Sequence, residues 1–356
     1  MEHTSYYVLG VMSGTSVDGI DLAFMKFEKD SSWNFDIIYA ETHPYTSEWQ
    51  IKLREAINCS RDQLKDLDQE YTFYLGKVIL EFIEKNKIES IDAISSHGHT
   101  VLHQPENGIT YQIGNRSQLA EITGNRIICD FRVQDVDYGG QGAPLVPVGD
   151  KYLFSEYDFC INIGGFANVS FDDKGNRLAY DICPTNIVLN YYAEKMGYPF
   201  DKNGEIAASN TVNKELLKKL NDLPFYKQPY PKSLGLEWVR EIIFPLLSNS
   251  GLPPENVIAT FTEHMAQQIA HSFSSTQKMN PTVLVTGGGA FNKHLIKRIN
   301  DLSNAKLILP DKKIIEFKEA LIFGFMGVLR LRNTDNVLKN VTGASKNHCS
   351  GVIFNP

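Results

Sequence analysis

At 356 residues the chain exceeds the size at which one hydrophobic core usually stops growing, so we expect two domains of roughly 150 residues each. A hydrophobic content of 42% with 22% charged residues is ordinary for a globular protein, and no apolar run approaches the roughly 20 residues of a membrane-spanning helix. The net charge of -7 argues against a nucleic-acid partner, because such binding depends on clustered Lys and Arg.

Signal and cysteine patterns favour a cytoplasmic protein with no membrane partner. The start, Met1 to Tyr7, has no basic segment followed by an apolar one, so we expect no secretion signal. The five cysteines are odd in number, widely spaced and without a Cys-x-x-Cys pair, so we expect reduced thiols. They are Cys59, Cys129, Cys160, Cys183 and Cys349.

The first half of the chain predicts strands that alternate with a long helix. Strands are predicted at residues 6–12, 20–27, 91–96, 110–113 and 127–130. A glycine-rich turn, Ser-Gly-Thr-Ser-Val-Asp-Gly, separates the first two strands, and the polar run Ser-His-Gly-His-Thr follows the third. From Leu64 to Ile83 apolar residues recur every three or four positions, which predicts a helix that packs on a core. The alternation indicates a mixed α/β sheet.

The second half opens with a similar unit. Residues 130–147 are dense in Gly, Pro, Asp and Gln, which is typical of a crossing between domains. We therefore place domain I at residues 1–130 plus about 330–356, and domain II at residues 131–329. Within domain II we expect strands at residues 159–163, 167–171 and 282–286, helices across much of 184–275, and a last helix over about 317–332.

Three glycine-rich turns have the composition of phosphate-binding loops, since glycine lets the backbone approach a phosphate and successive amides bind anions. The first also carries Asp18 and Asp21, which would repel a phosphate unless Mg²⁺ lies between them. A polar hairpin is the commoner explanation of any single such turn. Repetition at Gly164-Gly165 and at residues 287–289 favours a nucleotide held by both halves. No P-loop or Rossmann signature occurs.

These paired loops, with a late glycine-rich adenosine loop, resemble the actin, hexokinase and heat-shock chaperone superfamily. Within it, residues 10–21 (GVMSGTSVDGID) resemble the phosphate loop of anhydro-N-acetylmuramic acid kinases. The likeness continues along the whole chain at residues 96–100, 112–115, 130–132, 139–144, 162–165, 232–233, 287–290 and 319–320. Two departures occur: Asp181-Ile-Cys-Pro-Thr-Asn186 where the family has D-T-G-P-x-N, and Lys232-Ser-Leu-Gly235 where it has K-S-T-G.

The resemblance implies a two-domain actin-like (ribonuclease H-like) α/β fold with an active-site cleft between the domains. It implies an enzyme that uses ATP and Mg²⁺, opens the ring of 1,6-anhydro-N-acetylmuramic acid with water, and phosphorylates O6. The product would be N-acetylmuramic acid 6-phosphate, formed in peptidoglycan recycling and amino sugar catabolism. A sugar is the implied small-molecule partner, and a homodimer the implied assembly.

The resemblance also assigns site residues. Asp181 would be the general base that activates water, and Glu319 would help to hold that water. The implied ATP contacts are Gly14, Thr15, Ser16, Val17, Asp18, Gly19, Ile20, Asp21, Gly164, Gly165, Gly287, Gly288 and Gly289. Asp18 and Asp21 would bind Mg²⁺ through water. The implied substrate contacts are Ser13, Ser96, His97 and Arg132, the last as partner of the lactyl carboxylate.

Several of these residues have a structural alternative. Glu319 is placed in the first turn of a helix, where the helix dipole favours it. Arg132 suits a structural ion pair equally well, and Asp181 suits a helix cap. Histidines spaced like His97, His99 and His103 are more often hydrogen-bonded structure than metal ligands.

Three other functions stay open. One is another sugar or carboxylate kinase of the same superfamily. A second is a non-enzymatic, actin-like or chaperone-like ATP-binding protein, although no separate peptide-binding region follows the ATPase unit. The third is an inactive homologue, which the retained acid and glycine turns disfavour.

Overall fold

The computed structural model describes residues 4–275 and 278–356, so the predicted absence of a signal at residues 1–3 lies outside the described residues. The chain forms two compact units: unit 1 is Met1–Leu153 with Phe317–Pro356, and unit 2 is Phe154–Glu316. Residues 131–153 and 317–329, which the sequence assigned to domain II, belong to unit 1. Hydrogen bonding explains this difference, because Thr342 donates to buried Asp135 at 2.7 Å and Lys318 pairs with Asp150 at 2.7 Å.

Unit 1 is built on a seven-stranded mixed sheet. Its strands are β1 (Ser5–Ser13), β2 (Gly19–Lys29), β3 (Trp33–Pro44), β4 (Ala93–Gln104), β5 (Ile109–Ile113), β6 (Ile127–Cys129) and β12 (Val352–Phe354). The order is β12-β6-β4-β1-β2-β3, and β5 pairs with β4. Strands β1, β2 and β3 form an antiparallel meander, whereas β4 runs parallel to β1 and β6 runs parallel to β4.

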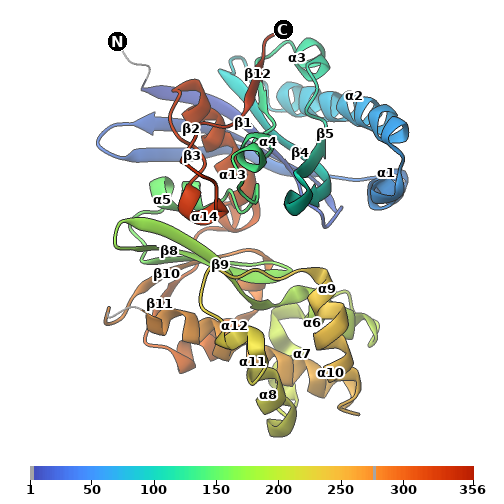
Figure 1. The fold of residues 1–356 in the computed structure, drawn as a ribbon, viewed down its shortest axis with the longest axis vertical. Coiled ribbons are helices and arrows are strands. Elements are labelled where there is room, and N and C mark those ends of the chain that lie inside the picture. Colours follow the sequence, from blue (N-terminus) through green and yellow to red (C-terminus); the bar gives the residue numbers. More distant parts are fainter. Residues whose placement is uncertain (1–3, 276–277) are drawn as a thin grey trace. The chain divides into compact units, whose positions relative to one another are not determined.

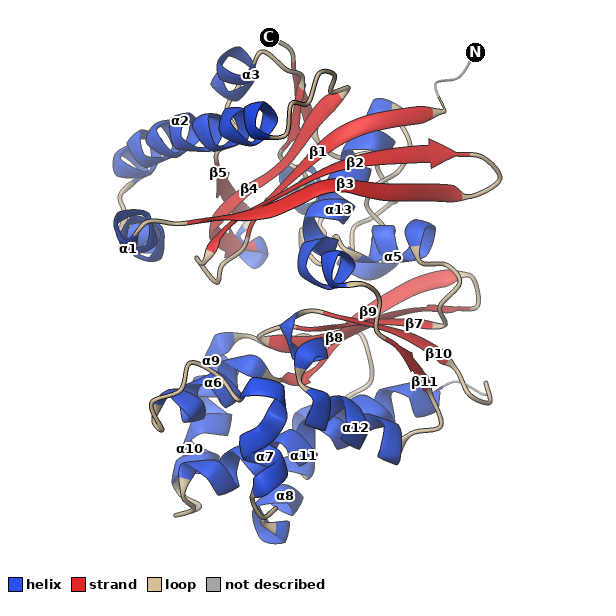
Figure 2. Ribbon diagram, turned by 180° about the vertical axis from the view of Figure 1, so that it is seen from behind, coloured by secondary structure: helices blue, strands red, loops and turns tan. Residues whose placement is uncertain are grey.

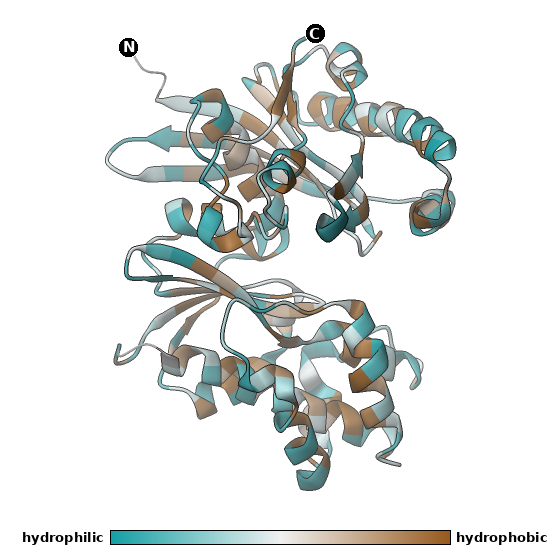
Figure 3. Cartoon of the chain, in the orientation of Figure 1, coloured by the Kyte–Doolittle hydropathy of each residue, from teal (hydrophilic) through white to brown (hydrophobic). Residues whose placement is uncertain are grey.

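The helices of unit 1 are α1 (Ser47–Glu55), α2 (Arg61–Lys85), α3 (Gln118–Thr123), α4 (Val133–Asp137), α5 (Pro147–Leu153), α13 (Lys312–Leu331) and α14 (Lys339–Thr342). Helix α13 begins five residues before Phe317, in unit 2, and continues into unit 1. The predicted helix is α2, which begins with a capping box between Ser60 and Gln63. Hydrophobic and hydrophilic residues alternate around its surface (Figure 3).

The two faces of β1 bury different helices. Leu9 and Val11 belong to the core cluster that includes the buried side of α2. Gly10 lies between them, and its side-chain position faces the other side of the sheet, since successive residues of a strand face opposite sides. A Cβ atom at Gly10 would lie 2.1 Å from the carbonyl oxygen of Ala320, so this glycine permits α13 to pack directly on the strand. Gly10 is therefore a packing position in the middle of β1, although its motif resembles a phosphate loop.

Unit 2 repeats the strand arrangement of unit 1 with five strands. They are β7 (Phe159–Ile163), β8 (Phe166–Asp173), β9 (Asn176–Pro184), β10 (Thr282–Thr286) and β11 (Lys306–Ile308), in the order β11-β10-β7-β8-β9. Again an antiparallel meander, β7 to β9, is extended on its β7 side by two parallel strands: β10 pairs with β7, and β11 pairs with β10. The prediction of an α/β protein in which each half opens with a strand, a glycine turn and a strand is confirmed.

The helices of unit 2 cover one side of this sheet (Figures 1 and 2). They are α6 (Asn186–Glu194), α7 (Glu205–Ser209), α8 (Lys214–Asn221), α9 (Leu236–Trp238), α10 (Phe244–Ser248), α11 (Pro254–Ser272) and α12 (Lys293–Leu302). Phe261 and Met265 of α11 are fully buried in one cluster with Phe159 and Ile161 of β7. Each such side chain contributes about 1.5 to 3 kcal/mol of hydrophobic free energy. Within the described ranges, no helix is long and apolar enough to cross a membrane.

Candidate active site

The first glycine turn joins β1 to β2 and presents polar groups to solvent. Thr15, Ser16 and Asp18 are exposed, and the Ser16 hydroxyl donates to Asp18 at 2.8 Å. Val17 closes the turn by donating its amide to the Gly14 carbonyl at 3.2 Å, with a φ of 58°. A non-glycine residue held in this left-handed region is strained, and such strain concentrates at functional sites. The turn thus offers hydroxyls and backbone amides, the groups that bind phosphate.

Not every residue of the predicted phosphate loop is available to a ligand. Ile20 is fully buried in the core, and a Cβ atom at Gly19 would lie 2.6 Å from the carbonyl oxygen of His43 on β3. The Ile20 side chain therefore fills the core, and the absence of a side chain at Gly19 permits close packing against β3. Asp21 accepts a hydrogen bond from Thr42 of β3 at 2.6 Å, which fixes its carboxylate beside the turn.

The acids of this turn suit water-mediated Mg²⁺ binding. In the part of the chain that the structure describes, no three His, Cys, Asp or Glu side chains gather closely enough to hold a metal ion by themselves. Mg²⁺ usually keeps several waters and takes one or two carboxylates plus substrate phosphates. The exposed carboxylate of Asp18 and the half-exposed carboxylate of Asp21 fit that chemistry.

The second and third glycine turns meet in unit 2. The turn Gly164-Gly165 follows β7 and is tied to the start of α6, because Thr185 donates its amide to the Gly165 carbonyl at 2.8 Å. The third turn follows β10, and a Cβ atom at Gly289 would lie only 2.2 Å from Ile163 at the end of β7. Gly287 adopts a φ of 80°, which favours glycine. The third turn is thus in direct contact with the end of β7, where the second turn begins.

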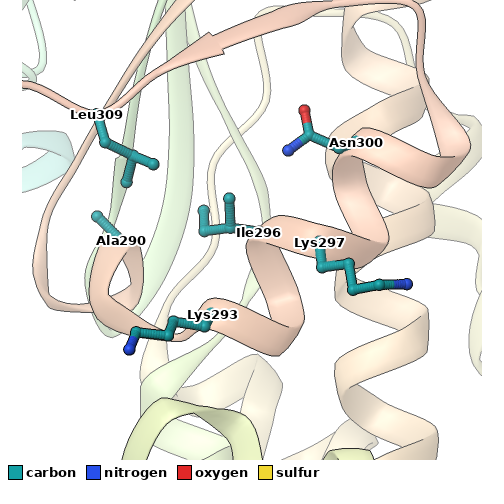
Figure 4. Close-up of a pocket in the computed structure, with 6 residues that line it drawn as sticks. All are labelled: Ala290, Lys293, Ile296, Lys297, Asn300 and Leu309. Carbon is teal, nitrogen blue, oxygen red and sulfur yellow. The ribbon is translucent and has the colours of Figure 1, made fainter.

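A cavity of about 330 Å³ lies beside the third glycine turn (Figure 4). Its apolar wall consists of Ala290, Ile296 and Leu309, and its polar lining of Lys293, Lys297 and Asn300. An apolar wall with a few polar groups at the rim suits a planar heterocycle.

Asp181 is held inside strand β9 by backbone groups. Its amide donates to the Lys232 carbonyl at 3.0 Å, and its Oδ2 accepts from the Leu234 amide at 2.8 Å. Partial burial raises the pKa of Asp181 above its usual range, and the bond from Leu234 opposes that rise. The helix-cap alternative does not describe this side chain, because Thr185 occupies the N-cap position of α6 and the Asp181 carboxylate binds Leu234.

The contact between Asp181 and residues 232–234 was not predicted from the sequence. The only signal was that both runs resemble family motifs. Leu234 stands where the family has threonine, yet it contributes its backbone amide to Asp181, and any residue other than proline supplies that donor. Its side chain lines a second cavity of about 410 Å³ with Phe225 and Trp238. The other departure, Ile182-Cys183, is buried in the core of unit 2.

In unit 1, Ser13 belongs to a buried chain of hydrogen bonds. Its hydroxyl lies 2.8 Å from Nδ1 of His99 and 2.7 Å from the Tyr45 hydroxyl, which lies 2.6 Å from the Tyr71 hydroxyl. Burial lowers the pKa of His99 to about 4, so this imidazole is neutral near pH 7. The Ser13 side chain is 2% exposed, which favours a supporting role over direct contact with a substrate.

His97 binds Arg132. The strand β4 continues through the polar run that was predicted to follow it, so His97 and His99 lie in the sheet. Nδ1 of His97 is 2.9 Å from the Gly98 carbonyl, and Nε2 accepts a hydrogen bond from Nε of Arg132 at 2.9 Å. Burial and the neighbouring guanidinium hold the pKa of His97 well below its usual range. Ser96 is also buried and accepts from the Gly98 amide at 3.2 Å.

Glu319 lies in the third turn of α13, so the first-turn, helix-dipole alternative is wrong. The surrounding protein raises the pKa of this carboxyl, Arg132 and Lys318 oppose the rise, and the side chain stays accessible to solvent. Arg132 donates Nη1 to the Gly142 carbonyl at 2.6 Å. Its hydrogen-bond partners among the described residues are neutral groups, so the structural ion-pair alternative is not observed there.

Comparisons of the sequence with protein families and with curated proteins identify the same family over nearly the whole chain. The family model described as Anhydro-N-acetylmuramic acid kinase matches residues 6–356. A protein of that name from Pseudomonas syringae pv. tomato is 33% identical over 373 residues, covering 98% of this chain and 99% of its own length. Another from Haemophilus influenzae is 34% identical over 376 residues, with 98% and 97% covered.

Solved structures match more distantly. The activator of the 2-hydroxyisocaproyl-CoA dehydratase from Clostridium difficile, with bound ADPNP, is 16% identical with a TM-score of 0.43, covering 92% of this chain and 97% of that one. The ROK hexokinase from Thermus thermophilus is 11% identical with a TM-score of 0.41, covering 90% and 99%.

Proposed function

The chain belongs to the anhydro-N-acetylmuramic acid kinase family, and we propose that it converts 1,6-anhydro-N-acetylmuramic acid, water and ATP into N-acetylmuramic acid 6-phosphate and ADP. The observation that carries this proposal is the match to the family model over residues 6–356. The bond from the Leu234 amide, which holds the Asp181 carboxylate in place, supports it. The reaction belongs to peptidoglycan recycling and amino sugar catabolism.

The chemistry requires two bonds to break in sequence. Asp181 takes a proton from water, the water oxygen bonds to C1, and the bond between C1 and O6 breaks. The freed O6 then attacks the γ-phosphorus of ATP, and the bond to the β-phosphate oxygen breaks to release ADP. A raised pKa makes Asp181 a stronger base than an exposed aspartate, which favours proton abstraction near neutral pH. Its carboxylate also stabilises positive charge that develops at C1.

One carboxylate oxygen of Asp181 is oriented by the protein and the other is left for water. Oδ2 accepts from the Leu234 amide, which fixes the plane of the carboxylate, so Oδ1 is the atom we assign to the water. Glu319 is the second carboxylate to which we assign a role in this chemistry. Its accessible side chain and raised pKa support a role in accepting or sharing a hydrogen bond.

We assign the nucleotide to the three glycine turns. The amides and hydroxyls of residues 14–18 and the turn Gly164-Gly165 would bind the phosphates, and residues 287–289 would contact the adenosine. The cavity lined by Ala290, Ile296 and Leu309 would receive the base. Mg²⁺, bound through water near Asp18 and Asp21, would neutralise phosphate charge during transfer.

Arg132 is the residue that we assign to the lactyl carboxylate of the sugar. Its guanidinium is charged and its hydrogen-bond partners are neutral, so an incoming carboxylate would supply a charge-assisted, bidentate pair. We further propose a cytoplasmic homodimer, as the family resemblance implies, and analytical ultracentrifugation tests the assembly.

Mass spectrometry of the reaction tests the proposed function. We expect protein, Mg-ATP and the anhydro sugar to give a product heavier than the sugar by one phosphate group plus one water. A product heavier by phosphate alone would contradict the coupled ring opening. Phosphorylation of ordinary hexoses in place of the anhydro sugar would instead favour another sugar kinase of the superfamily.

A further inference from the structure

His97, which is buried, and Arg132, which is half-buried, form a hydrogen-bonded pair from two separate parts of unit 1. His97 lies in β4, and Arg132 follows β6 at the start of α4. The His97 side chain is only 4% exposed, and its ring packs on Phe323 of α13 with centroids 4.5 Å apart. The imidazole therefore has a fixed position between a strand and a helix.

The hydrogen bonds of His97 define its tautomer. A carbonyl oxygen only accepts, so Nδ1 must carry the proton that is donated to Gly98. Arginine only donates, so Nε2 must be the unprotonated nitrogen that accepts from Nε of Arg132. Both ring nitrogens are thus occupied within the protein, which leaves no ring nitrogen for a substrate.

These bonds also determine which part of Arg132 can reach a ligand. Nε is taken by His97 and one proton of Nη1 by the Gly142 carbonyl. Two bonds from different nitrogens fix the orientation of the planar guanidinium. The remaining N–H groups, on Nη1 and Nη2, have no hydrogen-bond partner among residues 4–275 and 278–356. A carboxylate can accept two bonds from this end of the group.

We propose that His97 is a positioning residue, which orients the end of the Arg132 guanidinium toward the carboxylate of the acceptor sugar without touching the sugar itself. A neutral partner suits this role better than an acid. A carboxylate in the place of His97 would neutralise the guanidinium and compete with the ligand. This inference rests on the proposed function, because the carboxylate is that of the proposed substrate.

Three variants and two ligands test the proposal. His97→Met removes the acceptor at nearly constant size, His97→Gln keeps an oxygen near the position of Nε2, and Arg132→Gln removes the charge. The ligands are 1,6-anhydro-N-acetylmuramic acid and its methyl ester, whose lactyl group carries no charge. KM and kcat are measured for both, dissociation constants are measured by calorimetry, and the thermal midpoint of each variant is recorded.

For the acid we expect His97→Met to raise KM by about 10- to 100-fold, the effect of losing a hydrogen bond that involves a charged group. The change for the ester should be much smaller, and His97→Gln should recover most of the affinity. Because His97 acts through Arg132, the two substitutions should not be additive, and His97→Met should change little in the Arg132→Gln background.

Other outcomes would overturn the proposal. Equal losses for acid and ester would mean that His97 contacts the sugar elsewhere or serves only stability, and additive effects would separate His97 from Arg132. If the wild type fails to bind the acid, this inference fails together with the proposed function. Binding of the acid with normal discrimination against the ester, but without phosphorylation, would contradict the proposed function alone.

Discussion

The two units hold their candidate site residues by different means. In unit 1, side chains hold side chains: Ser13 is bound by His99 and Tyr45, Asp21 by Thr42, and Arg132 by His97. In unit 2, backbone groups provide more of this support, alongside the Thr185 hydroxyl, which donates to the Gly164 carbonyl at 2.7 Å. The Leu234 amide holds Asp181, the Thr185 amide holds the turn Gly164-Gly165, and the absence of a Cβ atom at Gly289 permits its contact with Ile163.

This difference determines which substitutions each unit tolerates. A hydrogen bond from a backbone amide is kept after almost any substitution of the side chain. A close contact at a glycine is lost when a substitution adds even one carbon atom. A buried network of side chains is instead sensitive to the loss of a polar group, because removing one member leaves the hydrogen-bonding groups of its partners unsatisfied. Among the candidate site residues, the third glycine turn of unit 2 should therefore be sensitive to added volume, and the polar network of unit 1 to the loss of polar groups.

The largest effect is expected at Asp181 of unit 2. Asp181→Asn should lower kcat by about 10² to 10⁴, because a carboxamide cannot accept the proton of water. The asparagine oxygen can still accept from the Leu234 amide, so the thermal midpoint should change little. Steady-state kinetics and thermal unfolding of the same preparation check both expectations. A variant that melts earlier yet keeps a near-normal kcat would make Asp181 a structural residue.

The glycines of the third turn provide a matched pair. Gly289→Ala should destabilise unit 2 by about 1 to 3 kcal/mol, since the new methyl would lie 2.2 Å from Ile163. We expect ATP binding to weaken because the turn must move. At Gly288 the nearest atom would be 3.9 Å away, so Gly288→Ala is the control and should keep its stability. Equal losses of stability in the two variants, measured by thermal unfolding, would refute the close contact; nucleotide titration measures the loss of ATP binding in Gly289→Ala.

Acid should weaken unit 1 through its buried histidine network. The pKa of His99 is about 4 in the folded protein and about 6.5 in an unfolded chain, so the unfolded state binds more protons between these values. Stability is therefore fully present above about pH 6.5 and falls as the pH drops toward 4, by up to about 1.4 kcal/mol per pH unit for this group.

His99→Gln lacks the titrating group and should show a shallower decline between pH 6.5 and 5. Urea unfolding at several pH values measures the slopes for both proteins. Parallel slopes for the variant and the wild type would exclude His99 as a source of the acid sensitivity.

The smallest effect is expected at a departure from the family pattern. Leu234→Thr restores the family residue but leaves the backbone amide that binds Asp181. We expect kcat to change little, because the donor that orients Asp181 is a backbone amide, which any residue other than proline supplies. A larger change in kcat would show that the side chain, which lines the cavity with Phe225 and Trp238, also controls the site.

Local patterns predicted much of this fold. The strand at residues 159–163 and the helix α2 have the expected apolar patterns, and each glycine turn is visible in the composition of its own segment. Strand β3 was missed because it is an edge strand that pairs only with β2 and exposes many of its side chains. It therefore lacks the regular apolar alternation by which a half-buried strand is found.

Long-range contacts could not be predicted in this way. Gly10 and Gly19 belong to a motif that resembles a phosphate loop, yet Ala320 and His43 show that both are packing positions. The bond between Leu234 and Asp181 joins residues 53 apart in the sequence. Roles that depend on such neighbours become visible only when the chain is folded.

The most direct test of the central claim follows the oxygen atom of water. In ¹⁸O-labelled water, with Mg-ATP and the anhydro sugar, the account predicts one labelled oxygen at C1 of the product and none in its phosphate. Unlabelled product kept in the same water for the same time controls for exchange at the anomeric carbon. Label in the phosphate, or a C1 oxygen labelled no faster than in this control, would contradict the coupled hydrolysis and phosphorylation.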